Sequence, residues 1–383
     1  MIKEKKIRVL QVGMSPYYGG TESFIMNQYR CLDRNKVQFD FLNVYQEEIA
    51  CQEEIINMGG KIYYLNMARH HGLREYYKNI DSFFAENAKN FQVVHCNYQS
   101  LINIDILKYA KKYQIPVRIA HAHNSGYGSV PTCFQKIIIR KNSKQIRKYA
   151  THYFACSTLA ADWMFSREAT IINNAIDVKK FRYSEEIRNK VRRENHLEGK
   201  KVVLFVGRLD PQKNPLFLLD IAKELSKKWI DLQMIIVGDG VLKQDMEKKI
   251  VQLKIEKYVT MLGNRNDVNE LLQGADFFLL PSLFEGLGIV LIEAQAAGVS
   301  TYTSKDVVPE AVKITELVHF ISLNESAQEW ANRIIENGVK NHMDTEESIC
   351  FAGYDNHTNA EKLQKTYEKL VEKSNENRDN YVS

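Results

Sequence analysis

Short hydrophobic runs alternate along the chain with longer segments whose apolar residues recur at helical spacing. The first run is IRVLQVG (7–13), and TESFIMNQYRCL (21–32) follows with the spacing of a helix and with Thr21 as a candidate cap. Further strand-like runs are FDFLNVY (39–45), KIYYLN (61–66), FQVVHCN (91–97), PVRIAHAH (116–123) and THYFACS (151–157). The first half of the chain therefore predicts strands separated by helices.

The same alternation starts again after a charged segment, residues 178–200, which reads as a linker plus a helix. The later strand-like runs are KKVVLFVGRLD (200–210), LQMIIVGDG (232–240), VTMLG (259–263) and ADFFLLPS (275–282). Strands that alternate with helices are typical of doubly wound parallel sheets. We therefore predict an α/β fold with one domain at 1–181 and a second at 182–355. A C-terminal helix within 356–383 is expected to pack back toward the first domain.

The composition is that of a soluble globular protein large enough for two hydrophobic cores. The chain has 383 residues, of which 44% are hydrophobic and 26% charged. No apolar run approaches the ~18 residues of a membrane span, and the N-terminus lacks the pattern of a signal peptide. The six cysteines are scattered without a C-x-x-C pair. These features predict free thiols in a reducing cytoplasm.

Positive charge is concentrated in the first half of the chain. Residues 1–182 carry 26 Lys and Arg against 15 Asp and Glu, a net +11, whereas residues 183–383 carry 26 against 32, a net −6. Within residues 101–150 ten basic residues face one acidic residue. Either this is a solvated helix face, or it meets an anionic partner such as a membrane leaflet, a lipid diphosphate or a nucleic acid. No nucleic-acid recognition motif accompanies it, so we expect no nucleic-acid partner.

Candidate binding residues follow directly after the predicted strands, where doubly wound folds bind their ligands. Two such domains in tandem usually bind ligands in the cleft between them. The strand-end segments are YYGGTE (17–22), HAHNS (121–125), GRLDPQKN (207–214), GDG (238–240), GNR (263–265) and FEGLG (284–288).

Arg208 and Lys213 lie on one of these loops, and two cations there suit a diphosphate. The alternative is a surface loop with ordinary basic residues. Gly286 and Gly288 precede an apolar helix, so backbone N–H groups and the helix N-terminus offer a second anion-binding feature. The segment is not a dinucleotide fingerprint, because Leu291 stands where G-x-G-x-x-G requires glycine.

Two glutamates bracket the start of this helix. Glu293 falls about two turns into a helix that we expect to begin near residue 287, among apolar neighbours. A carboxylate there is costly unless cations or hydroxyl groups satisfy it, and a ribose offers two adjacent hydroxyls. Glu285 lies on the loop before the helix, where it could contact a sugar. The alternative for Glu293 is a surface glutamate on a half-exposed helix.

These motifs together resemble the retaining nucleotide-sugar glycosyltransferases of family 4, which have the GT-B fold of two Rossmann-like domains. The resemblance rests on PSLFEGLGIVLIEAQAAG (281–298), with its E-x(7)-E spacing, and on GRLDPQKN upstream. YYGGTE, NDVNELLQGADFFLLPS (266–282) and IINNAIDVKKF (171–181) extend it over nearly the whole chain, although Ala175 replaces the glycine usual in the last. RIAHAHNS (118–125) is similar to the branch that builds bacterial capsular and exopolysaccharides.

The resemblance implies transfer of a hexose or N-acetylhexosamine from a nucleotide sugar, with UDP as the expected nucleotide. Arg208 and Lys213 would hold the donor diphosphate, Glu293 the ribose, and Glu285 the transferred sugar. The other implied donor-binding residues are Gly19 and Gly20 on the diphosphate and acceptor side, Gly263, Asn264 and Arg265 near the base, and Gly286, Leu287, Gly288 and Ile289 through their backbone.

The family also carries a histidine after a strand of its first domain, near the reacting carbon. His121 and His123 are two positions apart, so both point to the same face of a strand. The family's usual offset falls on Ala122 and does not choose between them. We favour His123, because it lies further into the loop, and expect the other histidine to be structural.

The implied mechanism is retention through front-face attack, in which the leaving diphosphate accepts the proton of the acceptor hydroxyl. The sequence contains no D-x-D motif, so we expect no metal and no other cofactor. Because it would contact hydroxyls of the sugar, Glu285 is not expected to act as a covalent nucleophile.

Enzymes of this kind commonly extend a saccharide linked to a polyprenyl diphosphate at the inner face of the plasma membrane. Residues 133–150 mix Ile137, Ile138, Ile139 and Ile146 with Lys and Arg, which suits an interfacial helix on anionic lipid. We therefore expect a cytoplasmic protein with peripheral membrane attachment. The competing hypotheses are a UDP-sugar 2-epimerase of the same fold and a non-catalytic partner subunit of another glycosyltransferase, which would be expected to lose the cations or the glutamates.

Overall fold

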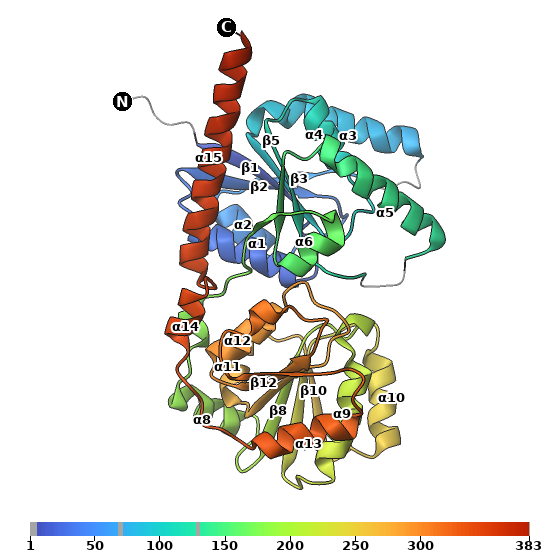
Figure 1. Ribbon diagram of the computed structural model, residues 1–383, viewed down its shortest axis with the longest axis vertical. Coiled ribbons are helices and arrows are strands. Elements are labelled where there is room, and N and C mark those ends of the chain that lie inside the picture. Colours follow the sequence, from blue (N-terminus) through green and yellow to red (C-terminus); the bar gives the residue numbers. More distant parts are fainter. Residues whose placement is uncertain (1–5, 68–71, 128–130, 383) are drawn as a thin grey trace. The chain divides into compact units, whose positions relative to one another are not determined.

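The computed structural model describes residues 6–67, 72–127 and 131–382, with side chains through residue 376. Its contacts divide the chain into two compact units, unit 1 with residues 1–175 and 356–383 and unit 2 with residues 176–355. The division therefore falls between Ala175 and Ile176, earlier than the 181/182 boundary expected from the sequence. In each unit, helices flank a parallel sheet (Figure 1). Each unit therefore has a Rossmann-like α/β fold.

Unit 1 contains a seven-stranded sheet in the order β3-β2-β1-β4-β5-β6-β7. Every pairing between neighbouring strands is parallel. The strands are β1 (Ile7–Val12), β2 (Val37–Asn43), β3 (Ile62–Tyr64), β4 (Val93–Tyr98), β5 (Val117–Ala122), β6 (His152–Ala155) and β7 (Thr170–Ile171).

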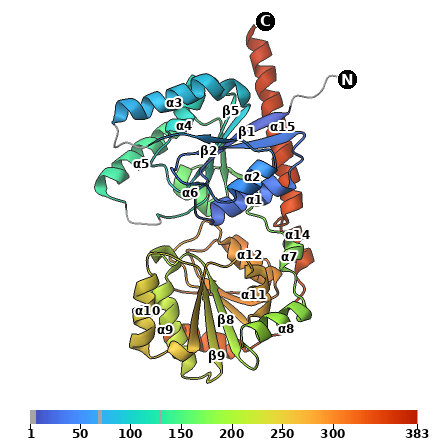
Figure 2. The same cartoon turned by 180° about the vertical axis from the view of Figure 1, so that it is seen from behind.

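The helices of unit 1 connect these strands and cover both faces of the sheet (Figure 2). They are α1 (Gly20–Cys31), α2 (Gln52–Asn57), α3 (Leu73–Asn87), α4 (Asp105–Lys112), α5 (Cys133–Gln145), α6 (Thr158–Phe165) and the last helix, α15 (Asn356–Val382). Two 3₁₀ turns, η2 (Ala88–Asn90) and η3 (Ile146–Lys148), extend α3 and α5.

Unit 2 contains a six-stranded parallel sheet in the order β10-β9-β8-β11-β12-β13. Its strands are β8 (Lys201–Val206), β9 (Leu232–Val237), β10 (Val259–Gly263), β11 (Phe277–Leu280), β12 (Ser300–Ser304) and β13 (Val318–Ile321). Its helices are α7 (Val178–Phe181), α8 (Glu185–Glu194), α9 (Pro215–Ser226), α10 (Lys243–Leu253), α11 (Val268–Gly274), α12 (Ile289–Ala296), α13 (Ala327–Asn337) and α14 (Glu346–Phe351), with 3₁₀ turns η4 (Pro211–Lys213), η5 (Glu256–Tyr258) and η6 (Glu310–Val312).

Most strands are apolar because both faces of a parallel sheet are covered. Strand β12 is the exception, since its sequence STYTS is polar and yet every residue in it is buried. Its two threonine hydroxyls are satisfied by backbone: Thr301 Oγ1 donates to the Val299 carbonyl and Thr303 Oγ1 to the Leu280 carbonyl, both at 2.9 Å. The apolar runs of the sequence therefore did not reveal this central strand, and they also missed β7 and β13.

The C-terminal helix α15 belongs to the hydrophobic core of unit 1. Four of its side chains are buried in the same cluster as residues of α1, β1 and β2, namely Ala360, Leu363, Tyr367 and Val371. Both cartoons show α15 beside α1 (Figures 1 and 2). Unit 1 is therefore completed by residues that follow the whole of unit 2 in the sequence.

Helix α1 begins earlier than the sequence indicated, because Gly19 rather than Thr21 occupies the cap position. The Gly19 N–H donates to Oε2 of Glu22 at 3.1 Å, and the Gly19 carbonyl accepts from the Ser23 N–H at 2.8 Å. The carboxylate of Glu22 thus supplies the cap that was assigned to a threonine hydroxyl.

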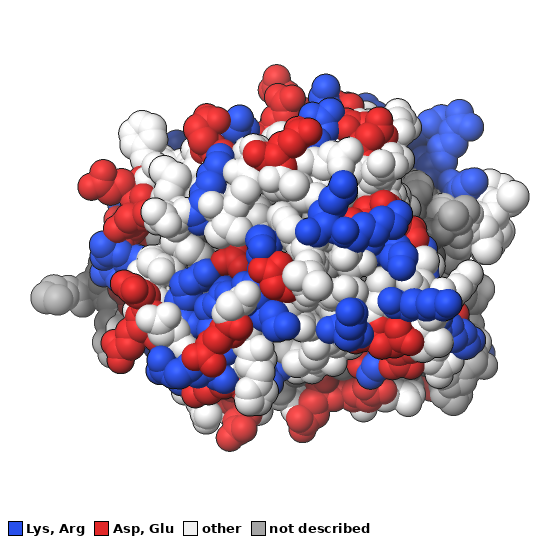
Figure 3. Space-filling model, turned by 90° about the horizontal axis from the view of Figure 1, so that it is seen from below, with Lys and Arg blue, Asp and Glu red and all other residues white. Residues whose placement is uncertain are grey.

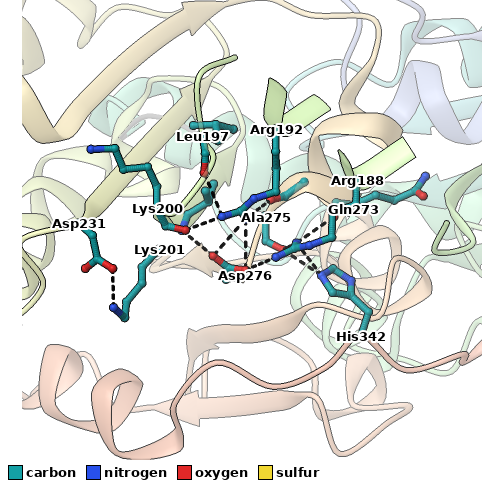
Figure 4. A network of polar contacts seen from close by, with 12 residues as sticks. Arg188, Arg192, Leu197, Lys200, Lys201, Asp231, Gln273, Ala275, Asp276 and His342 are labelled. Carbon is teal, nitrogen blue, oxygen red and sulfur yellow. Dashed lines mark hydrogen bonds and ion pairs between the residues drawn. The ribbon is translucent and has the colours of Figure 1, made fainter. Parts of the chain in front are cut away.

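The charged segment 178–200, which reads as a linker plus a helix, forms α7 and α8 of unit 2. Two arginines of α8 converge on Asp276 at the start of β11 (Figure 4). Arg188 lies 2.5 Å from one carboxylate oxygen of Asp276 and Arg192 lies 3.4 Å from the other, while the Val202 N–H donates to Asp276 at 2.8 Å. Charge in this segment therefore docks α8 against the sheet.

The described residues contain no helix with the length and apolar composition that crossing a bilayer requires. Figure 3 shows one face of the molecule, on which basic and acidic side chains are intermixed.

We predict that Asp276→Asn will destabilise unit 2 by about 3 kcal/mol, because it leaves two mostly buried guanidinium groups without a charged partner. Urea denaturation followed by the fluorescence of Trp229 and Trp330, which lie in unit 2, measures this change. Asp344→Asn is the matched control, since the pair of Asp344 with Arg182 is more than half exposed and its loss should change little. Equal stability of the two variants would contradict the docking role.

Candidate functional site

In unit 2 the loop after β8 runs close to the loop after β9. A Cβ placed on Gly238, whose φ is +134°, would lie 2.0 Å from the Gly207 carbonyl oxygen. The backbones are also joined by hydrogen bonds from the Gly207 N–H to Val237 (3.0 Å) and from the Leu209 N–H to Asp239 (3.0 Å). Only glycine at 238 permits this approach, which fixes the loop that carries Arg208 and Lys213.

Lys213 and Glu285 form a buried ion pair. The Lys213 Nζ lies 2.6 Å from Glu285 Oε1, and their side chains are 15% and 5% exposed. The Ser282 hydroxyl donates to the same carboxylate oxygen at 2.6 Å. The resemblance assigns Lys213 to a diphosphate and Glu285 to a sugar. The structure places the two groups in direct contact, so any ligand meets them as one unit.

Arg208 extends from the same loop and is mostly exposed. Its side chain is 60% accessible and lies 3.2 Å from Asp210 and 3.3 Å from the Gln212 amide oxygen. Gln212 is buried and links this loop to the loop that carries Glu285. Its side-chain Nε2 donates to the Phe284 carbonyl at 3.2 Å, and its backbone carbonyl accepts from the Leu283 N–H at 2.8 Å. The sequence analysis did not single out Gln212, although it stands within GRLDPQKN.

The glycine loop leads into α12, which begins at Ile289 rather than near residue 287. Gly288 caps it with a φ of +81°, a conformation that favours glycine. Gly286 and Leu287 are buried, whereas Gly288 and Ile289 keep partial exposure. The free N–H groups of the first helical turn therefore follow immediately after the buried Lys213–Glu285 pair.

Glu293 lies in the second turn of α12 with a half-buried side chain. No hydrogen bond to its carboxylate is found among the described residues. Burial raises the pKa of the Glu293 carboxyl to about 7, and the Lys180 ammonium partly opposes this rise. The two glutamates therefore differ: Glu285 is paired with Lys213 and Ser282, whereas the carboxylate of Glu293 has no hydrogen-bond partner among the described residues.

The segment from Gly263 to Arg265 ends β10. Gly263 has a φ of +66°, and its carbonyl accepts from the Gly238 N–H at 2.8 Å, which joins this segment to the loop after β9. Asn264 is exposed. Arg265 is engaged by Asp267 through two contacts of 2.8 and 2.5 Å, so its guanidinium is occupied within its own loop.

In unit 1 the glycine loop before α1 is held by the buried Glu22. Its Oε1 accepts from the Ser15 N–H at 2.9 Å and from the Ser15 hydroxyl at 2.8 Å, while Oε2 accepts from Gly19. Gly20 is exposed, and a Cβ added there would meet nothing within 4 Å. Sequence reasoning named the two glycines of YYGGTE but overlooked its last residue, which organises the loop.

The two candidate histidines lie at the end of β5. His121 is fully buried and its Nδ1 lies 2.9 Å from Nε2 of His95, a histidine that the sequence analysis did not identify. His123 follows the strand, is 8% exposed, and its Nε2 lies 2.8 Å from Oδ1 of Asn97. Burial lowers the pKa of His95 and of His123 to about 3 and that of His121 well below its usual value, so all three rings are neutral at pH 7.

No cluster of three or more His, Cys, Asp or Glu side chains placed to hold a metal ion occurs within residues 6–67, 72–127 and 131–376.

The similarities of this chain to known proteins are extensive. The family model described as "Glycosyl transferases group 1" matches residues 186–338, most of unit 2. The putative glycosyltransferase EpsF of Bacillus subtilis (strain 168) is 28% identical over 376 residues, which cover 96% of this chain and 97% of that protein. The UDP-Gal:alpha-D-GlcNAc-diphosphoundecaprenol alpha-1,3-galactosyltransferase of Escherichia coli is 25% identical over 320 residues, 78% of this chain and 79% of that one.

Among solved structures, Anabaena Alr3699/HepE in complex with UDP and glucose matches with a TM-score of 0.74 at 17% identity. The match covers 94% of this chain and 99% of that chain. At this identity the likeness concerns the fold. Both units therefore follow an architecture seen in glycosyltransferases.

We predict that Glu293→Gln will stabilise the ligand-free protein at pH 8 by on the order of 2 kcal/mol, less than a fully buried shift would imply, because the side chain is only half-buried. Burial disfavours the ionised form of Glu293 in the folded state. The wild-type protein therefore loses no stability below pH 4, where the group is protonated in both states, and loses the full amount above pH 7. The gain should accordingly vanish as pH falls through this window. Thermal unfolding from pH 4 to 8 measures it, with Glu247→Gln on the exposed face of α10 as control. A pH-independent difference would contradict the raised pKa.

Proposed function

We propose that the chain is a group 1 glycosyltransferase that transfers a hexose or an N-acetylhexosamine from a UDP-sugar to a lipid-linked saccharide. The name of the Escherichia coli relative specifies a UDP-sugar donor and a diphosphoundecaprenol-linked acceptor. The Anabaena structure holds UDP and glucose. The proposed role in capsular or exopolysaccharide synthesis rests on RIAHAHNS (118–125), the segment similar to the branch that builds these polymers.

The observation that carries this proposal is the arrangement at the start of α12 in unit 2. The buried Lys213–Glu285 pair, the open N–H groups after Gly288 and the unpaired carboxylate of Glu293 lie on one short segment and its neighbouring loop. Cations and helix N–H groups suit a diphosphate, and a carboxylate suits the two hydroxyls of a ribose. Together they fit a nucleoside diphosphate better than any single anion.

The residues divide the donor among them. Arg208 is mostly exposed and would turn from Asp210 toward a phosphate, while Lys213 would lie next to the point where negative charge grows on the leaving diphosphate. Glu285, held by Lys213 and Ser282, would accept hydrogen bonds from hydroxyls of the transferred sugar. In unit 1, Gly19, Gly20 and His123 would serve the diphosphate, the acceptor and the reacting sugar.

The reaction we propose retains the configuration of the sugar and uses no metal. The bond from the anomeric carbon to the diphosphate oxygen breaks while the acceptor hydroxyl oxygen bonds to the same face of that carbon. The proton of the acceptor hydroxyl passes to the departing diphosphate. Lys213, Arg208 and the α12 N-terminus would stabilise the charge that a divalent cation otherwise balances.

We predict that UDP will stabilise the protein equally with and without EDTA, by about 2.7 kcal/mol at a hundredfold excess over Kd. GDP, ADP, uridine and UDP-sugars complete the thermal-shift screen. Glu293→Gln should weaken uridine and UDP alike by roughly tenfold, through lost charge-assisted hydrogen bonds. Arg208→Ala should weaken UDP and spare uridine, because it removes a phosphate contact only.

Glu247→Gln again serves as the control and should bind as the wild type does. If no nucleotide bound, the proposed function would fail, and the partner-subunit hypothesis would gain support. Stabilisation by GDP alone would replace UDP as the donor nucleotide, and stabilisation that EDTA abolished would overturn metal independence.

We further propose that α5 attaches unit 1 to the inner face of the plasma membrane. Phe134 and Ile137 on this helix are 71% and 66% exposed, which is unusual for large apolar side chains. The exposed basic side chains of the same segment are Lys136, Arg140, Lys141, Lys144, Arg147 and Lys148. This combination of apolar and cationic groups suits an anionic bilayer surface.

The exposed apolar side chains of α5 are Phe134 and Ile137, not the four isoleucines expected from the sequence. Of the four isoleucines singled out there, only Ile137 is exposed, whereas Ile138 and Ile139 are half-buried and Ile146 is buried in η3. Asn142 turns the opposite side of α5 inward, because its Nδ2 donates to the Leu101 carbonyl at 2.8 Å.

We predict that the protein will float with vesicles rich in phosphatidylglycerol at low salt and will be released at high salt. Replacing Phe134 and Ile137 together by serine should reduce the bound fraction severalfold. Val251→Ser is the control, since Val251 is 61% exposed on α10 of unit 2. If the vesicles bound the double variant as well as they bind the wild type, α5 would be excluded as the attachment site.

A further inference from the structure

The histidines at the end of β5 belong to a buried network that reaches the C-terminal helix. The Tyr367 hydroxyl of α15 lies 2.6 Å from Nδ1 of His95, and Nε2 of His95 lies 2.9 Å from Nδ1 of His121. Gln11 of β1 also contacts this hydroxyl, with its Nε2 donating at 3.4 Å. All four side chains are at least 98% buried.

A second branch of the network runs to His123. The Nδ2 of Asn97 donates to Gln11 Oε1 at 3.0 Å and to the Val12 carbonyl at 3.1 Å. A backbone carbonyl only accepts, so the amide nitrogen of Asn97 must face it and the amide oxygen must face His123. That oxygen lies 2.8 Å from Nε2 of His123. His123 therefore donates through Nε2–H, and its Nδ1 is an acceptor.

The first branch has a direction for the same reason. Gln11 donates to the Tyr367 oxygen, and within the described residues the one acceptor in reach of the Tyr367 O–H is Nδ1 of His95. His95 must then carry its proton on Nε2 and donate it to Nδ1 of His121. His121 is thereby also held with its proton on Nε2.

We propose that Tyr367 and Asn97 are positioning residues that hold His121 and His123 in the Nε2–H tautomer, so that His123 presents Nδ1 as an acceptor for a hydroxyl of the transferred sugar. This role rests on the proposed glycosyl transfer. His123 Nδ1 and His121 Nε2 are buried and have no partner among the described residues. An unpaired acceptor and an unpaired donor stand on adjacent rings, whose centroids are 4.1 Å apart.

The network also gives α15 a part in the site beyond packing. Tyr367 packs in the hydrophobic core and, through its hydroxyl, sets the proton positions of residues at the end of β5. The tautomer of a histidine is set by the hydrogen bond at one of its ring nitrogens. Removing the Tyr367 hydroxyl would therefore release the tautomers of both His95 and His121.

The test is a measurement of histidine tautomers in the full-length, ligand-free protein. Long-range ¹H–¹⁵N NMR spectra of protein labelled at its ten histidines distinguish protonated from unprotonated ring nitrogens. His95→Gln, His121→Gln and His123→Gln assign the signals. We expect protonated Nε2 and unprotonated Nδ1 at both His121 and His123.

Two variants separate the branches. Tyr367→Phe should turn His121 into a mixture of tautomers and leave His123 unchanged, whereas Asn97→Ala should do the reverse. Tyr76→Phe is the matched control, because Tyr76 is a buried tyrosine of unit 1 whose hydroxyl donates to Asp105 at 2.9 Å. It should change neither histidine.

With the donor identified by nucleotide binding, Asn97→Ala, which changes the tautomer of His123, should lower kcat roughly tenfold at unchanged KM, while Tyr76→Phe should not. A proton on Nδ1 of His123 in the wild type would overturn the proposal, as would an unaltered His121 in Tyr367→Phe or an unaltered kcat in Asn97→Ala. If the wild type bound no sugar nucleotide, the proposed function would fail and the positioning role with it. The tautomer spectra, which need no ligand, would still show whether the network exists.

Discussion

Helices cover both faces of each parallel sheet, and this confines polar chemistry to the strand ends. In unit 2 the carboxyl ends of β8, β10 and β11 carry the cations, the glycine segments and the glutamates. In unit 1 the same ends of β1, β4 and β5 carry the glycine loop and the histidines. Close packing then decides whether each polar side chain has a hydrogen-bond partner. A polar side chain that is buried without a partner costs free energy.

The two glutamates near α12 illustrate both outcomes. Glu285 is buried with Lys213 and Ser282, so its charge is balanced before any ligand arrives. Glu293 is held half-buried by apolar neighbours without a hydrogen bond from the described residues, which raises its pKa. The first arrangement stabilises the ligand-free protein, whereas the second carries a cost that a pair of hydroxyl donors would relieve.

The histidines of unit 1 follow a similar logic over a much longer sequence distance. His95 and Tyr367 are 272 positions apart, yet they share a short hydrogen bond inside one core. Helix α15 thus contributes apolar side chains to the core and one hydroxyl to the polar network within it. Buried histidines kept neutral can neither repel one another nor exchange protons freely, so their orientation depends on the groups that contact them.

The sequence by itself determined the α/β class, the two parallel sheets and the strand-end loops, because apolar runs and glycine positions are local signals. It did not reveal β12, whose sequence is polar although all its residues are buried and neighbouring backbone accepts the hydroxyls of its two threonines. It indicated a linker plus a helix at 178–200, and α8 is that helix, but it did not show that the arginines of α8 pair with Asp276, which is distant in the chain. The pairing of Lys213 with Glu285, the hold of Glu22 on its glycine loop, and the links from Tyr367 and Asn97 to the histidines were decided by tertiary structure alone. Periodicity records which face of an element is buried, but the partner of a buried polar group depends on how distant segments meet.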